Sequence, residues 1–96
     1  MLQPPILSKE GYEIQFAANH LAHALILKFL LPSLLASAST TTDGKLADVR
    51  IVFVSSLAFN FQKKGGIQFD TLNTVQDFGV LGPWFRYGQS KLGELV

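Results

Sequence analysis

Two residues near the carboxyl end of the chain, Tyr87 and Lys91, have the types and the spacing of a proton-transfer pair. On a helix, positions four apart lie on the same face, one turn from each other, so both side chains can reach one reacting group. An ammonium group beside a phenol favours the phenolate form. The pair therefore predicts that Tyr87, assisted by Lys91, acts as a general acid and base near neutral pH.

Ser56 is predicted to complete this group. The preceding residues 49–54 form a continuous β-branched and aromatic run, typical of a central parallel strand covered on both faces. A hydroxyl at the carboxyl end of such a strand points into the crevice where open α/β sheets hold ligands. Ser56 is therefore a candidate donor of a hydrogen bond to a substrate oxygen.

Three segments surround these residues: NHLAHAL at 19–25, RIVFVSSLA at 50–58 and YGQSKL at 87–92. A tyrosine and a lysine at this spacing are a weak signal by themselves, so the three segments matter as a set. Together they resemble the middle of a short-chain dehydrogenase/reductase, and within that family they are most similar to retinol-dehydrogenase-like members. The resemblance covers nearly the whole chain.

The resemblance implies a role for each candidate site residue. Tyr87 would be the general acid/base, and Lys91 would hold the nicotinamide ribose and tune Tyr87. Ser56 would polarise the substrate carbonyl, and Asn19 would support a proton-relay water. Ser56 is chosen over Ser55 because the family's catalytic serine is the second of such a pair, and Ser55 is then expected to be a strand residue.

The family also implies a cofactor and a class of reaction. NADP is expected, with NAD as the alternative, and Tyr87 and Lys91 are expected to contact it. The reaction would be the interconversion of an alcohol and a ketone or aldehyde. Phe59 stands where a histidine is common in the subgroup, so the identity of the small-molecule substrate is left open.

The expected fold class is α/β, with part of a Rossmann-type doubly wound parallel sheet. Apolar residues three and four positions apart predict one long helix from about residue 9 to about residue 38. Ser8 is its expected N-cap, and Pro32 is expected to kink or split it. After a long loop at 57–83, a second helix is predicted from residue 84 or 85 to the end of the chain.

We interpret residues 1–96 as an incomplete NAD(P)-binding domain, the central section of a short-chain dehydrogenase. The family's glycine-rich phosphate loop and its Asn-Asn-Ala-Gly segment do not occur in the sequence. The chain is therefore expected to begin in the middle of the domain.

The portion of the long helix at residues 21–38 is apolar nearly all round. This pattern is typical of a helix that packs on a sheet and has its other face against a partner. A membrane span is the alternative, but His23, Lys28 and Pro32 fall inside the only candidate window, which is short for a span. The buried-helix interpretation is therefore preferred.

The composition excludes several classes of function. The formal net charge is +1 and the basic residues are scattered, which argues against a nucleic-acid partner. The absence of cysteine excludes disulfides and thiolate metal sites and suits a reducing compartment, so a cytoplasmic location is expected. His20 and His23 lie three apart, but no acidic partner accompanies them at metal-ligand spacing, so packing histidines are the preferred interpretation.

A second class of function stays open. The chain could be a short, non-catalytic interaction module, or a product that does not fold stably alone. Helices of the predicted kind commonly pair subunits in the family, so a homo-oligomer through the two helices is also expected.

Overall fold

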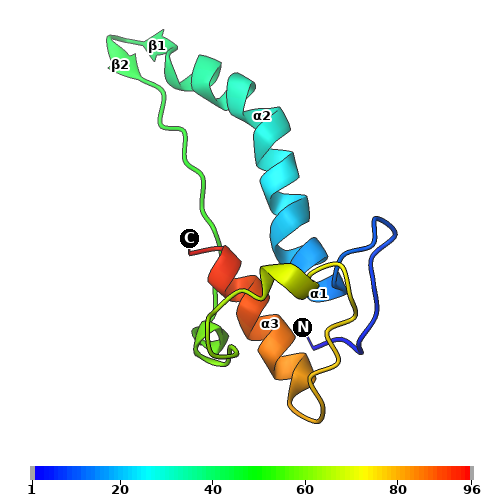
Figure 1. Ribbon diagram of the computed structural model, residues 1–96. Helices are drawn as coiled ribbons and strands as arrows, with labels where there is room; N and C mark the ends of the chain where they lie inside the picture. Colours follow the sequence, from blue (N-terminus) through cyan, green and yellow to red (C-terminus); the bar gives the residue numbers. More distant parts are fainter. Residues whose placement is uncertain (1, 96) are drawn as a thin grey trace.

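The computed structural model describes residues 2–95, which form helices joined by long loops. In chain order the elements are α1 (Ile14–Phe16), the π-helix η1 (Ala17–Leu21), α2 (Ala22–Ala38), the strands β1 (Thr41–Thr42) and β2 (Lys45–Leu46), the 3₁₀-helices η2 (Leu57–Asn60) and η3 (Phe69–Thr71), and α3 (Gly82–Gly93). Figure 1 shows α2 projecting away from α3, with the hairpin of β1 and β2 at its far end. The described chain is correspondingly elongated, with extents of 57 × 27 × 21 Å.

The long helix begins later than the sequence predicted, and Ser8 does not cap it. The N-cap is Glu13, whose carboxylate accepts hydrogen bonds from the amides of Gln15 and Phe16 at 3.0 and 2.7 Å. The amide of Ser8 instead donates to the carbonyl of Tyr12 at 2.7 Å, closing a turn. A carboxylate at the first amides of a helix also suits the positive end of its dipole.

From Ile14 to Ala38 the chain is helical throughout, so the predicted single long helix is confirmed over this range. Pro32 lies inside α2 and does not split it. Figure 1 shows the helix axis bending in its upper half, as expected where proline removes a backbone donor. By length and composition the helix Ile14–Ala38, in which an 18-residue window has a mean hydropathy of 1.7, could cross a membrane, although the core helix of a soluble protein meets the same criteria.

The predicted central strand at residues 49–54 is not found as a strand. This segment runs alone between β2 and η2 (Figure 1), and among residues 2–95 the only sheet is the antiparallel pair of β1 and β2. The expected doubly wound parallel sheet is therefore not present in the described chain. The physical reason is that a strand exists through ladder hydrogen bonds to a neighbour, and within the described range no second extended segment pairs with residues 49–54.

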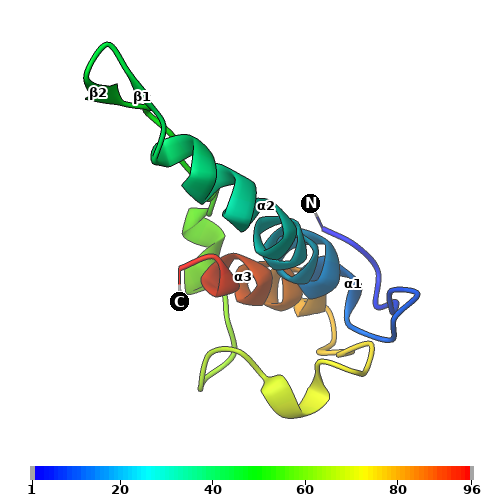
Figure 2. The same ribbon diagram turned by 90° about the horizontal axis from the view of Figure 1, so that it is seen from above.

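The second predicted helix is confirmed as α3, which starts two residues earlier than the earlier of the two predicted positions. Pro83 lies in its first turn, where the missing amide hydrogen costs no helical bond. The predicted end at Val96 lies outside the described residues. Figure 2, viewed from above, shows α3 between η2 and the beginning of the long helix, and it packs on η2, α1 and η1.

The interior around α3 is small and unusually polar. Its buried apolar residues are Phe16, Ala58 and Leu72. The buried polar and charged residues are Glu13, Gln15, Gln76, Arg86, Gln89 and Ser90. Polar contacts rather than a large apolar core therefore hold the loops on α3.

Many large apolar side chains remain exposed. On α2 they are Leu25, Ile26, Phe29, Leu30, Leu31 and Leu35, and on the extended segment they are Ile51, Val52, Phe53 and Val54. Large apolar side chains exposed in such numbers are typical of surfaces on which other protein or lipid packs.

Candidate functional site

Tyr87 and Lys91 lie one turn apart on α3, as their spacing predicted. The ammonium nitrogen of Lys91 is 5.9 Å from the centroid of the Tyr87 ring, and both residues are half-buried. Lys91 Nζ also donates a hydrogen bond to the carbonyl of Val54 at 3.0 Å. This bond fixes the ammonium group between the phenol and the end of the extended segment.

The two adjacent serines have different contacts. The hydroxyl of Ser55 donates to the backbone carbonyl of Lys91 at 2.9 Å, which ties the extended segment to α3. The hydroxyl of Ser56 accepts a bond from the amide of Ala58 at 3.2 Å and caps η2. A hydroxyl can accept one hydrogen bond and donate another at the same time. The Ser56 hydroxyl accepts within the chain and can still donate to a ligand, whereas the Ser55 hydroxyl already donates to the Lys91 carbonyl.

Asn19 is joined to α3 through Ser90. Its side-chain amide donates to Ser90 Oγ at 3.0 Å, and Ser90 Oγ donates to the backbone carbonyl of Tyr87 at 2.7 Å. Asn19 lies in the π-helix η1, and such wide turns inside α-helices occur frequently at functional sites. The structure therefore connects Asn19 to the turn that carries Tyr87.

Gly88 allows η2 to approach α3. A Cβ atom at Gly88 would overlap the backbone carbonyl oxygens of Ala58 and Phe61, so only glycine permits this contact. Sequence reasoning assigned no role to Gly88. A signal was available, because glycine inside a helix costs roughly 1 kcal/mol relative to alanine and usually has a packing reason.

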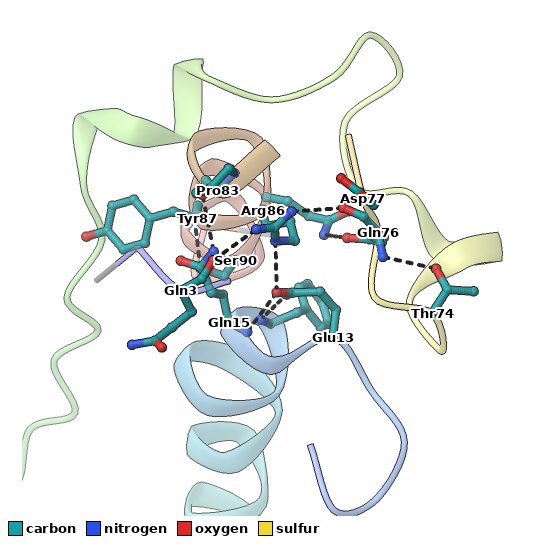
Figure 3. Close-up of polar contacts among 12 residues, drawn as sticks. Gln3, Glu13, Gln15, Thr74, Gln76, Asp77, Pro83, Arg86, Tyr87 and Ser90 are labelled. Carbon is teal, nitrogen blue, oxygen red and sulfur yellow. Dashed lines mark hydrogen bonds and ion pairs between the residues drawn. The ribbon is translucent and has the colours of Figure 1, made fainter. Parts of the chain in front are cut away.

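Arg86 and Glu13 form a buried ion pair beside the site. Their Nε and Oε1 atoms are 3.5 Å apart, and the two side chains are 1% and 0% exposed. The guanidinium also donates to the carbonyls of Gln76 and Gln3, each at 2.9 Å. In Figure 3 the Tyr87 ring points away from this pair, so Arg86 anchors α3 from the side opposite the phenol.

His20 and His23 have an acidic neighbour that the spacing along the chain did not show. The Nδ1 atoms of the two imidazoles lie 3.3 and 4.0 Å from Glu94 Oε1, and the Glu94 side chain is nearly buried. His20 also packs on Phe16, with ring centroids 5.1 Å apart. Within residues 2–95 the structure has no group of three or more histidine, cysteine, aspartate or glutamate side chains arranged to hold a metal.

A mostly apolar groove of ≈ 430 Å³ runs from Lys91 along α2. The residues that line it are His23, Ile26, Leu27, Leu30, Leu34, Arg50, Ile51, Val52, Phe53, Val54, Lys91 and Glu94. The Lys91 ammonium therefore lies at the edge of an open space large enough for part of a small organic molecule.

Curated proteins similar to this chain are oxidoreductases. An uncharacterised oxidoreductase of Schizosaccharomyces pombe is 40% identical over the whole chain, which spans 27% of that relative. A short-chain dehydrogenase/reductase of Aspergillus calidoustus is 36% identical over the whole chain, which spans 29% of it. The chain belongs to the short-chain dehydrogenase/reductase family.

The predicted subgroup is confirmed as well, because retinol dehydrogenase 14 of Homo sapiens is 36% identical over 97% of this short-chain dehydrogenase sequence. The chain spans only about a quarter of the length of these relatives. No family model matches the chain, and no solved structure matches it. A relative from Brassica napus is named as chloroplastic, so the expected cytoplasmic location stays a prediction.

Proposed function

We propose that this chain carries the catalytic section of an NAD(P)-dependent oxidoreductase that interconverts an alcohol and a ketone or aldehyde. The observation that supports it is the pairing of Tyr87 with Lys91 on α3, with the end of the serine-bearing segment bound to Lys91. Membership of a dehydrogenase family supports the interpretation of this arrangement as a proton-transfer group.

In the direction of reduction, Tyr87 gives its phenolic proton to the substrate oxygen. The hydroxyl of Ser56 donates a hydrogen bond to the same oxygen and stabilises the negative charge that develops there. Lys91 stabilises the phenolate that Tyr87 becomes, because its ammonium group is held beside the ring. In the direction of oxidation, the phenolate takes the proton from the alcohol.

The residues present fit the nicotinamide-ribose end of the cofactor. An ammonium group has three donors, and Lys91 uses one of them on the Val54 carbonyl, which leaves two for ribose hydroxyls. When bound, the nicotinamide would supply or accept the hydride. We propose NADP rather than NAD from the resemblance to the subgroup, with the diphosphate held by a glycine-rich loop elsewhere in a longer protein.

We also propose that residues 1–96 are the middle section of a Rossmann-type domain. In that domain residues 49–54 would be a central strand, and its neighbours would cover the apolar faces of this segment and of α2. Two facts support this: Val52 and Val54 are 80% and 73% exposed in the described chain, and the relatives are far longer than the chain. A homo-oligomer through α2 and α3 stays a proposal on the same grounds.

The interaction-module alternative has its own supporting observation. The apolar side chains of α2 are uncovered, and Phe29 is 72% exposed. A partner protein could bind there without any chemistry at Tyr87. The two functions differ in whether hydride is transferred, which deuterium transfer from labelled NADPH or NADH to an aldehyde decides.

The adjacent serines provide a test of the proposed catalytic group. In the full-length protein, Ser56→Ala should lower turnover roughly 100-fold, because it removes a donor to the reacting oxygen. Ser55→Ala should cost only about 1 kcal/mol of stability, since it removes one hydrogen bond to the Lys91 carbonyl. Turnover of decanal with NADPH and urea unfolding measure the two effects. Equal losses of turnover in both variants would contradict the assignment of Ser56.

A further inference from the structure

A buried cluster of glutamines joins the loop after η2 to α3. Gln89 lies at its centre: its Oε1 accepts a hydrogen bond from the Gln68 amide at 2.8 Å, and its Nε2 donates to Gln76 Oε1 at 2.7 Å. Gln76 and Gln89 are 3% and 2% exposed. We call Gln68, Gln76 and Gln89 the glutamine latch.

Gln76 makes further hydrogen bonds that connect the glutamine latch to the loop and to Arg86. Its side-chain nitrogen donates to the carbonyl of Gln68 at 3.3 Å and to the hydroxyl of Thr71 at 3.0 Å, and its backbone carbonyl accepts from Arg86 (Figure 3). Gln76 adopts φ 50°, a left-handed conformation that is unfavourable for a residue with a side chain. The hydrogen bonds of the latch compensate for this conformation.

The glutamine latch contacts α3 on the side opposite the Tyr87 side chain. Residues two apart on a helix point in nearly opposite directions, since each step turns the helix by about 100°. Gln89 therefore faces the loop when Tyr87 faces away from it, and Figure 3 shows Tyr87 pointing away from Gln76. The position of the loop relative to Tyr87 is thus set by contacts that do not touch Tyr87.

The two ends of the loop and the first turn of α3 together form an apolar pocket. The pocket has a volume of ≈ 270 Å³, and its lining residues are Phe61, Leu81, Trp84 and Phe85. Phe61 and Leu81 flank the latched part of the loop, and Trp84 lies one helical turn before Tyr87. A shift of the loop on α3 that moves Phe61 or Leu81 therefore changes the width of this pocket.

We propose that Gln76 and Gln89 are positioning residues that hold the loop so that this pocket receives the apolar part of the carbonyl substrate. The proposal rests on the proposed function. A buried hydrogen-bonded cluster suits this task better than apolar contacts, because a shifted register would leave buried amides without partners. An apolar contact would tolerate small shifts of the loop.

The test compares Gln89→Met with Gln3→Met in the full-length protein. Methionine has a similar length but cannot hold the Gln68 amide or the Gln76 oxygen, whereas the Gln3 side chain is exposed and serves as the control. In Gln89→Met we expect hydrogen exchange at residues 66–76 to rise about 10-fold or more, in line with two lost hydrogen bonds. The KM for decanal with NADPH should rise about 10-fold and by a larger factor than kcat falls.

The coupling between the two glutamines gives a second readout. Gln76→Gly removes the side chain and relieves the left-handed conformation, so adding Gln89→Met to it should change KM less than Gln89→Met does alone. Unchanged hydrogen exchange at residues 66–76 in Gln89→Met would contradict the claim that the glutamine latch holds the loop on α3. Faster exchange with an unchanged KM would overturn its positioning role. A wild-type protein without turnover would contradict the proposed function, and exchange would still decide whether the latch exists.

Discussion

Replacing Tyr87 with phenylalanine should reduce turnover roughly 10²- to 10⁴-fold while cofactor affinity stays nearly unchanged. The substitution removes only the phenolic hydroxyl, which is the proposed proton donor and acceptor. The bonds that hold this turn of α3 are made by other atoms, namely Ser90 Oγ to the Tyr87 backbone carbonyl and Lys91 Nζ to the Val54 carbonyl. The fold around the site should therefore survive the change.

The measurement is steady-state turnover in the full-length protein, together with NADPH affinity by fluorescence titration. Tyr12→Phe is a matched control, because Tyr12 is the other tyrosine of the chain and is 44% exposed. It should leave both quantities at the wild-type values. Unchanged turnover in Tyr87→Phe would eliminate Tyr87 as the acid and base.

Replacing Gly88 with alanine should destabilise the protein by about 3 kcal/mol, at the upper end of what overpacking usually costs. The new Cβ would overlap the carbonyl oxygens of Ala58 and Phe61, and backbone atoms cannot rotate out of the way as a side-chain tip can. To relieve the overlap η2 would have to move off α3. Turnover should fall as well, because Ser56 caps η2 and would move with it.

Urea unfolding of the full-length protein measures this loss of stability, with Gly93→Ala as the control. A Cβ at Gly93 would meet the His20 ring, whose nearest atom is 2.9 Å away, but that ring belongs to a partly exposed side chain, whereas the atoms that Gly88 meets belong to the backbone. Gly93→Ala should therefore cost clearly less than Gly88→Ala. If Gly88→Ala is as stable as the wild type, the contact between η2 and α3 is not the one described.

Local patterns in the sequence predicted the two main helices well, because helix formation depends mostly on residues three and four positions apart. The helix that carries Tyr87 and Lys91 and the long helix that carries Asn19 both form, and their packing joins Asn19 to the Tyr87 turn through Ser90. The roles of the site residues stay predictions. What the spacing established was that Tyr87 and Lys91 share one face of a helix.

The errors have a common cause in contacts between distant parts of the chain. Ser8 and Glu13 are both residue types that can cap the long helix, and Glu13 is the residue that caps it. Glu13 is held in place by distant residues, because its amide donates to the Leu72 carbonyl and its carboxylate pairs with Arg86. Residues 49–54 have strong β propensity, but propensity provides no partner strand. The polar interior around Gln76 and Gln89 was also missed, because glutamine is mostly found on protein surfaces and carries no pattern that indicates burial.

The central claim is that this chain supplies the catalytic group of a hydride-transferring oxidoreductase. The most direct test incubates the full-length protein with decanal and with NADPH or NADH that carries deuterium at the reactive position of the nicotinamide. We predict that deuterium appears on the carbinol carbon of the alcohol product with one of the two cofactors, and that Tyr87→Phe abolishes its appearance. If no deuterated alcohol forms with either cofactor over a range of aldehydes and ketones, the proposed function is contradicted and the interaction-module alternative is favoured.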